Sequence, residues 1–199
     1  RHGNRVGALL YGAGVEKMIP ARASRAHVLH LLHAIRHRPA PAAPTARTTT
    51  RLSDLLLAAA NATRRRSTIF VVSDFISEPG WEKPLAQLAT RHEVVAVRLL
   101  DPLELELPDL GLLTLRDAET GEHLLVDTHD PRFRRRFAAI AAQREAELRA
   151  ALARAGVDTL ELSTEDDLAS AIVRFTEMRR QRARLAAGGG MPAHLRKSA

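Results

Sequence analysis

Two apolar runs, at residues 69–72 (IFVV) and 94–97 (VVAV), constrain the fold of this chain more than any other feature. Continuous β-branched runs without polar alternation are typical of parallel strands that are covered on both faces. Between them, Trp81, Leu85 and Leu88 follow helical spacing, which makes the segment a strand–helix–strand unit. This alternation predicts an α/β fold, with a doubly wound, mostly parallel sheet and helices on both faces.

The remaining elements follow from turn residues, caps and apolar periodicity. A buried stripe of Val28, Leu31, Leu32 and Ile35 predicts the first helix. The other expected elements are a hairpin of strands 6–11 and 15–19 that turns at residues 12–14, helices at 26–37 and 54–63, the second capped by Ser53, an inserted hairpin of strands 112–116 and 122–127 with Gly121 in its turn, a long helix that stops at Gly156, a strand around Leu160 and Leu162, and a last helix from capping boxes at Ser163 and Thr164 to about Arg180.

Length and composition indicate one soluble domain. The 199 residues suit a single core at residues 1–182, followed by a flexible glycine-rich tail at 183–199. The chain has no cysteine and no apolar run that approaches the roughly 20 residues of a membrane-spanning helix. We therefore expect a cytoplasmic location and no membrane segment in this chain.

The net charge of +7 raises the question of nucleic-acid binding. The charge is segregated: residues 1–66 carry 12 basic and 2 acidic groups, 67–130 carry 4 and 13, and 131–199 carry 14 and 8. Single-strand binders usually add stacking aromatic residues, which make up only 4% of this chain. We therefore expect no nucleic-acid partner, and tight, steeply salt-dependent DNA binding would overturn this expectation.

Asp74 is the strongest candidate for a functional residue, because it directly follows the best predicted strand. Ligands of doubly wound sheets bind at the carboxyl ends of the strands, and a carboxylate there suits Mg²⁺. Ser53 and Asp54 precede the neighbouring helix, so their oxygens could approach the same edge. The plainer alternatives are that Asp74 caps the next loop and that Ser53 caps its helix.

Other motifs do not add up to a catalytic site. Four histidines lie on one arc of the first predicted helix, which indicates a solvated face rather than a metal cluster; they are His27, His30, His33 and His37. The turn at residues 12–14 lacks the third glycine of a dinucleotide-binding fingerprint, since Lys17 stands there. No Gly-x-Ser-x-Gly elbow and no second aspartate after Asp74 is present, so we expect no enzyme.

An acidic loop at residues 101–109 mixes three leucines with four carboxylates. One interpretation is a docking surface for a protein partner, in which the carboxylates of Asp101, Glu104, Glu106 and Asp109 make the contacts. In the other, the leucines cover the edge of the core and the carboxylates are merely solvated.

Several motifs, in order and spacing, resemble the bacterial, MoxR-associated, von Willebrand factor A-like family called domain of unknown function 58. The matching segments are residues 5–12 (RVGALLYG), 53–55 (SDL), 70–75 (FVVSDF), 91–97 (RHEVVAV), 101–102 (DP), 107–111 (LPDLG), 117–122 (DAETGE), 125–128 (LVDT), 130–131 (DP), 155–158 (AGVD) and 160–164 (LELST). The resemblance extends to about residue 180 and is closer to the shorter soluble members than to those with membrane helices.

The resemblance implies a Rossmann-type fold with a metal-ion-dependent adhesion site. In the family this site combines an Asp-x-Ser-x-Ser motif, a loop threonine and a later aspartate. Asp74 matches the aspartate, and Ser53 stands at the threonine position, where Leu52 replaces the usual preceding glycine. The Asp-x-Ser-x-Ser segment does not occur here, so we expect a C-terminal fragment with an incomplete site, which binds Mg²⁺ only in the intact protein.

The resemblance also implies that the first central strand is missing. That strand would lie between the strands at 6–11 and 69–72, so its loss exposes unpaired backbone groups and apolar faces. We therefore expect this fragment to be poorly stable by itself.

In function, the resemblance implies a non-catalytic interaction module. Its expected partners are a MoxR-type AAA+ ATPase and a client protein that the pair assembles or activates. The alternatives are a Mg²⁺-dependent hydrolase that uses Asp74, which would lose activity in Asp74→Ala, and a nucleic-acid binder that uses the basic first third.

Overall fold

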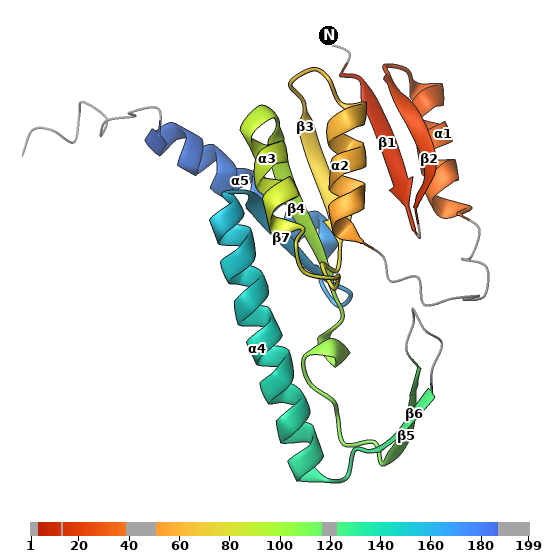
Figure 1. Ribbon diagram of the computed structural model, residues 1–199, viewed down its shortest axis with the longest axis vertical. Coiled ribbons are helices and arrows are strands. Elements are labelled where there is room, and N and C mark those ends of the chain that lie inside the picture. Colours follow the sequence, from red (N-terminus) through yellow and green to blue (C-terminus); the bar gives the residue numbers. More distant parts are fainter. Residues whose placement is uncertain (1–3, 13, 39–50, 117–122, 187–199) are drawn as a thin grey trace, which may run out of the picture.

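The computed structural model describes residues 4–12, 14–38, 51–116 and 123–186, and Figure 1 shows their arrangement. The elements are β1 (Val6–Tyr11), β2 (Val15–Arg22), α1 (Arg25–Arg36), α2 (Leu52–Ala62), β3 (Thr68–Ser73), α3 (Glu82–Arg91), β4 (Glu93–Leu100), the short 3-10 helix η1 (Pro102–Glu104), β5 (Leu112–Arg116), β6 (His123–Asp127), α4 (Pro131–Ala155), β7 (Asp158–Ser163) and α5 (Leu168–Ala186).

A parallel three-stranded sheet forms the centre of the fold, in the order β3-β4-β7. Helices α2, α3 and α4 cover one face through an apolar core that includes Leu56, Leu85 and Leu152. Helix α5 covers the other face, where Phe175 packs on Val95 and Val97 of β4. The prediction of an α/β fold with parallel strands and helices on both faces is confirmed.

The first hairpin belongs to a separate sheet. Strands β1 and β2 pair antiparallel, and α1 packs on them through a small core that contains Ile19, Leu31 and Ala34. In the described part of the chain β1 does not pair with β3, so the edges of both strands remain unpaired on the sides that face each other (Figure 1).

The prediction that β3 is covered on both faces is wrong. Val71 is buried on the side of α2 and α3, but Phe70 and Val72 on the other side are 59% and 56% exposed. The reason is that α5 lies over β4 and contacts Val95 and Val97 rather than β3. Strand β3 is thus half-covered among the described elements.

The predicted stripe of α1 is only partly buried. Leu31 and Ala34 are buried against the hairpin, whereas Val28, Leu32 and Ile35 are exposed by about half. A two-stranded hairpin is too narrow to cover the full apolar arc of a helix. One flank of the stripe therefore remains uncovered by described residues.

Two predicted helix caps are corrected by the structure. Helix α2 begins at Leu52 rather than Asp54, and its first free amide donates to Ser77 Oγ at 3.0 Å, so Ser53 does not cap it. Helix α5 begins at Leu168, where Asp167 accepts from the Ala169 amide at 3.1 Å. The cap of α2 comes from a loop 25 residues away, and that of α5 comes from Asp167, three residues after the predicted cap Thr164.

Helix α4 and the second hairpin form an extension of the fold. Asp130 caps α4 by accepting from the Arg132 amide, and Gly156 ends it in a left-handed conformation at φ 67°, as predicted. Figure 1 shows the β5–β6 hairpin at the far end of α4 from the sheet. The hairpin turn with Gly121 lies outside the described residues. Helix α5 continues past the expected end near Arg180 to Ala186, and the remaining tail is also outside the described part.

Candidate functional site

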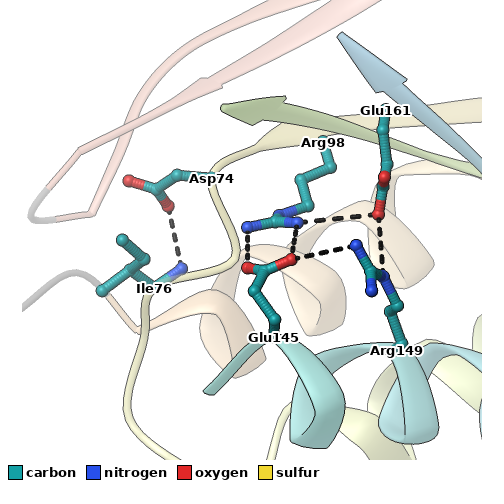
Figure 2. A network of polar contacts seen from close by, with 6 residues as sticks. All are labelled: Asp74, Ile76, Arg98, Glu145, Arg149 and Glu161. Atoms are coloured by element: carbon teal, nitrogen blue, oxygen red, sulfur yellow. Dashed lines mark hydrogen bonds and ion pairs between the residues drawn. The ribbon is translucent and has the colours of Figure 1, made fainter. Parts of the chain in front are cut away.

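Asp74 lies at the carboxyl end of β3, and its side chain is exposed. Its Oδ1 accepts a hydrogen bond from the amide of Ile76 at 3.0 Å, which Figure 2 shows. The same oxygen accepts a second hydrogen bond from Ser73 Oγ at 3.3 Å. This is an aspartate turn, in which the side chain holds its own loop. The predicted capping role of Asp74 is therefore present, and it orients an exposed carboxylate at the edge of the sheet.

Phe75 fixes the backbone beside Asp74. It has φ 62°, an unusual value for a bulky residue, and it is the only described residue other than glycine with positive φ. Its ring is buried and lies 5.5 Å from that of Trp81, while its amide donates to Ser73 Oγ at 3.0 Å. Such strain persists only where packing enforces it, so the buried ring holds the loop in this conformation.

The start of α2 is bound to the same loop. Besides the hydrogen bond that the Leu52 amide donates to Ser77 Oγ, Arg51 pairs with Glu78 at 2.9 Å. These contacts bring the start of α2 to the Asp74 edge, where Leu52 and Leu55, but not Ser53, line a pocket together with Asp74. The Ser53 hydroxyl donates to Asp54 at 3.4 Å, so its recorded hydrogen bond is to its neighbour in the chain.

A small pocket of about 160 Å³ lies at this edge. Its lining joins Tyr11, the last residue of β1, to the start of α2 and the end of β3; the other lining residues are Leu52, Leu55, Val72, Ser73, Asp74, Ile76 and Ser77. Burial, and then the negative charge of Asp54, raise the pKa of Tyr11. Tyr11 was missed by sequence reasoning, because only the topology brings the ends of β1 and β3 together.

The four carboxylates of the predicted docking loop separate into different roles. Asp101 caps η1 by accepting from the Leu103 amide at 3.0 Å, and Asp109 pairs with Arg134 at 3.0 Å and with His129 at 2.5 Å. Glu106 is exposed. Burial, followed by the charges of Asp74 and Asp101, raises the pKa of Glu104. Glu104 thus interacts electrostatically with the Asp74 edge.

Behind that edge, four charged residues form a network that we name the Arg98 cluster: Arg98, Glu145, Arg149 and Glu161 (Figure 2). Arg98 on β4 is only 4% exposed, and both terminal nitrogens bond the carboxylate of Glu145 on α4, one of them at 2.7 Å. Glu161 of β7 lies 3.6 Å from Arg98, and Arg149 reaches Glu145 at 3.5 Å. The cluster joins α4 to two strands.

A buried bidentate pair of this kind fixes the position of α4 relative to β4, because both charges are satisfied in only one arrangement. The sequence carried one signal for it: Arg98 interrupts the apolar run of β4. Its partner is 47 positions away in the chain, so no local pattern could identify it.

The donor set does not fit a complete metal site. Among the residues that the structure describes, no group of three or more histidine, aspartate or glutamate side chains is arranged to hold a metal ion. Asp74 Oδ1 already accepts two hydrogen bonds, and the Ser53 hydroxyl is directed to Asp54. These two residues alone fall short of the six or so oxygens that Mg²⁺ requires.

The remaining sequence candidates lie away from this edge. On α1, His27 contacts the Val6 carbonyl at 2.9 Å, and His33 and His37 stack with ring centroids 4.0 Å apart.

No helix in the described segments is both long and apolar enough to cross a membrane.

Comparisons with known proteins identify relatives over most of the chain. The model of a family described as "Protein of unknown function DUF58" matches residues 1–147. An uncharacterized protein of Mycobacterium tuberculosis is 37% identical over 180 residues, which are 90% of this chain and 55% of that protein. An uncharacterized protein of Mycobacterium avium is 41% identical over 118 residues, 59% of this chain and 69% of that protein. The chain therefore spans about half the length of the first of these relatives.

Among solved structures, the conserved hypothetical protein BatB from Bacteroides thetaiotaomicron is similar in fold. The TM-score is 0.50 at 11% identity, over 92% of this chain and 82% of that one. At this identity the likeness bears on the fold alone.

Proposed function

Because the chain belongs to the DUF58 family of proteins of unknown function, we propose that it is a non-catalytic protein-interaction module whose contact surface is centred on Asp74. One observation carries the proposal. The Asp74 carboxylate is exposed and is held by a backbone amide and a hydroxyl, in a loop that Phe75 keeps in a strained conformation. A rigid, exposed acidic group suits recognition of a partner.

By its resemblance to the MoxR-associated family, the module acts in the cytoplasm with a MoxR-type AAA+ ATPase, in the assembly or activation of a client protein. Glu104, whose carboxyl interacts electrostatically with Asp74, and the exposed Glu106 of the same loop are the further contact residues. Asp101 and Asp109 support the shape of that loop through η1 and Arg134.

The adhesion site is complete only in a longer protein. Asp74 and Ser53 supply two of its oxygen groups, and the Asp-x-Ser-x-Ser segment supplies the others from a central strand between β1 and β3. That strand also makes the sheet doubly wound. Mg²⁺ is then a cofactor of the intact protein and is not bound by these 199 residues.

The test is binding between the intact protein and a MoxR-type AAA+ ATPase of the same organism. Asp74→Asn keeps the size of the side chain and its acceptor oxygen but removes the charge. We expect at least a tenfold weaker Kd by calorimetry, with Glu165→Gln, an exposed acidic residue before α5, as the matched control. Equal affinities of Asp74→Asn and the unaltered protein would refute the Asp74-centred surface.

A further inference from the structure

The β5–β6 hairpin carries apolar side chains that no described element covers. Figure 1 shows the hairpin at the far end of α4 from the sheet, and no described strand pairs with either of its edges. Leu112 and Leu125 are 70% and 67% exposed, more than the other large apolar residues of the described chain. Exposed apolar side chains that gather in one place mark a site of interaction.

The strand register assigns these leucines to one face of the hairpin. Leu112 pairs with Asp127 and Thr114 pairs with Leu125, and side chains alternate between the two faces of a strand. Val126 belongs to the opposite face and is buried, so the hairpin is anchored on that side. Five exposed residues remain on the free side, which we name the outer face: Leu112, Thr114, His123, Leu125 and Asp127.

The outer face of β6 is self-complementary. From the tip of the hairpin to its base it presents His123, then Leu125, then Asp127, a sequence of basic, apolar and acidic groups. If two copies stack with their β6 strands antiparallel, Leu125 meets its counterpart and His123 of each copy faces Asp127 of the other. A parallel arrangement would place like groups on like. A twofold axis generates the antiparallel arrangement, in which the same patch serves both copies.

The acidic end of this pattern is held in place. Oδ1 of Asp127 accepts a hydrogen bond from the amide of His129 at 2.9 Å, so the carboxylate has a fixed orientation. A histidine N–H can donate to such a carboxylate whether the ring is neutral or protonated. The pairing of His123 with Asp127 across the axis therefore specifies the orientation of the two copies.

We propose that the outer face binds the outer face of a second copy of this chain, with the two β6 strands antiparallel and Leu125 on the twofold axis. A two-stranded hairpin alone is only marginally stable, and a second apolar layer stabilises it. Interfaces that bury less than about 1,200 Å² in total are typical of transient complexes. Because the outer face comprises only two short strands, we expect a reversible dimer with a Kd in the micromolar range.

Sedimentation of the intact protein over a range of concentrations tests the proposal. Leu125→Glu places two carboxylates against each other on the axis, so we expect the Kd of the dimer to rise at least tenfold. Leu124→Glu is the matched control, since Leu124 is the adjacent residue, is 63% exposed and belongs to the opposite face. We expect it to leave the Kd unchanged. Equal Tm values of the two variants at a concentration where both are monomeric exclude unfolding as the cause.

Two substitutions of His123 test the orientation. His123→Asp opposes Asp127 of the other copy and should weaken the dimer at least tenfold, whereas His123→Arg keeps the attraction and should leave it as strong or stronger. Equal effects of the two substitutions would contradict the antiparallel arrangement.

Disulfide cross-linking tests the position of the axis, because these 199 residues contain no cysteine. Two cysteines can join only where their Cα atoms are within about 7 Å. Leu125→Cys should therefore form a cross-linked dimer under mild oxidation at least tenfold faster than Leu124→Cys. The unaltered intact protein serves as the background for any cysteine outside these residues.

Three outcomes would overturn the proposal. An intact protein that is monomeric up to millimolar concentration does not pair through this face, and another part of the chain or another partner is then its occupant. A dimer that Leu125→Glu and Leu124→Glu weaken equally, or not at all, is formed elsewhere. Equal rates of cross-linking at the two positions exclude the axis at Leu125. The measurements involve neither Asp74 nor an ATPase, so the dimer and the proposed function can fail separately.

Discussion

At the scale of single residues, Phe75 shows how packing stabilises a conformation that its own backbone disfavours. A non-glycine residue in this left-handed region costs about 1–3 kcal/mol. Phe75→Ala loses the buried ring and retains the strain, whereas Phe75→Gly loses the ring and removes the strain. We expect the glycine variant to be the more stable of the two by about 1 kcal/mol, against the usual order. Urea unfolding of the intact protein checks this, and a more stable alanine variant would show that the loop relaxes.

Arg98 supports a second prediction. Arg98→Leu leaves the Glu145 carboxylate buried without its main partner, which typically costs about 3–5 kcal/mol. Replacing both residues by leucine removes the unpaired charge and restores most of that stability. Arg149→Gln, on the exposed side of the cluster, serves as control and costs under about 1 kcal/mol. A double variant no better than Arg98→Leu would show that the pair contributes through packing instead.

His92 supports a prediction about pH. It is buried between the end of α3 and the start of β4, and neither ring nitrogen has a partner in the described residues. Burial first, and then the charge of Arg91, lower its pKa. In the unfolded chain the His92 imidazole binds its proton near pH 6.5, whereas in the folded chain it does so only at lower pH. The free energy of unfolding is therefore highest above about pH 6.5 and decreases as the pH falls below that value. His92→Leu should flatten this fall in urea midpoints between pH 5 and 7, while exposed His30→Gln leaves it unchanged.

At the scale of elements, α2 depends on a cap that comes from another loop. Ser77→Ala removes the acceptor of the Leu52 amide, so we expect a loss of about 1 kcal/mol. Ser53→Ala, one residue into the helix, should cost much less. Thermal unfolding of the two variants compares them, and a larger effect of Ser53→Ala would restore Ser53 as the cap.

The elements also show what could be predicted from the sequence. The strands at 69–72 and 94–97, the long helix and its Gly156 end were predicted, because local apolar periodicity and a left-handed glycine determine them. The cap of α2 and the partner of Arg98 were not, since they depend on contacts 25 and 47 residues away. The burial of Phe70 was overestimated, because the apolar pattern of a strand does not show whether the elements that pack on it are present. For the site, the sequence identified Asp74 at the end of its strand. It did not identify Tyr11, which lines the same pocket only because the fold places the end of β1 near the end of β3.

At the scale of the whole molecule, the separation of the β1–β2 hairpin from the parallel sheet predicts weak cooperativity. No ladder joins the two sheets among the described strands, and the exposed side chains of Phe70 and Val72 add apolar surface. The isolated 199-residue chain should therefore unfold over a broad temperature range and bind a hydrophobic dye before heating. A sharp, two-state transition with a well-dispersed NMR spectrum would show that the chain is stable without its proposed central strand.

The length of α4 gives the Arg98 cluster a mechanical meaning. Glu145 lies 14 residues after Pro131, so about 20 Å of helix extends from the cluster toward the β5–β6 hairpin. The buried pair is then a fulcrum and the first half of α4 a lever. A tilt of roughly 10° about Arg98 would displace the hairpin by about 4 Å, calculated from the same helical rise. A partner that pulls on the hairpin would therefore apply its torque within the sheet, close to the edge where Asp74 is exposed.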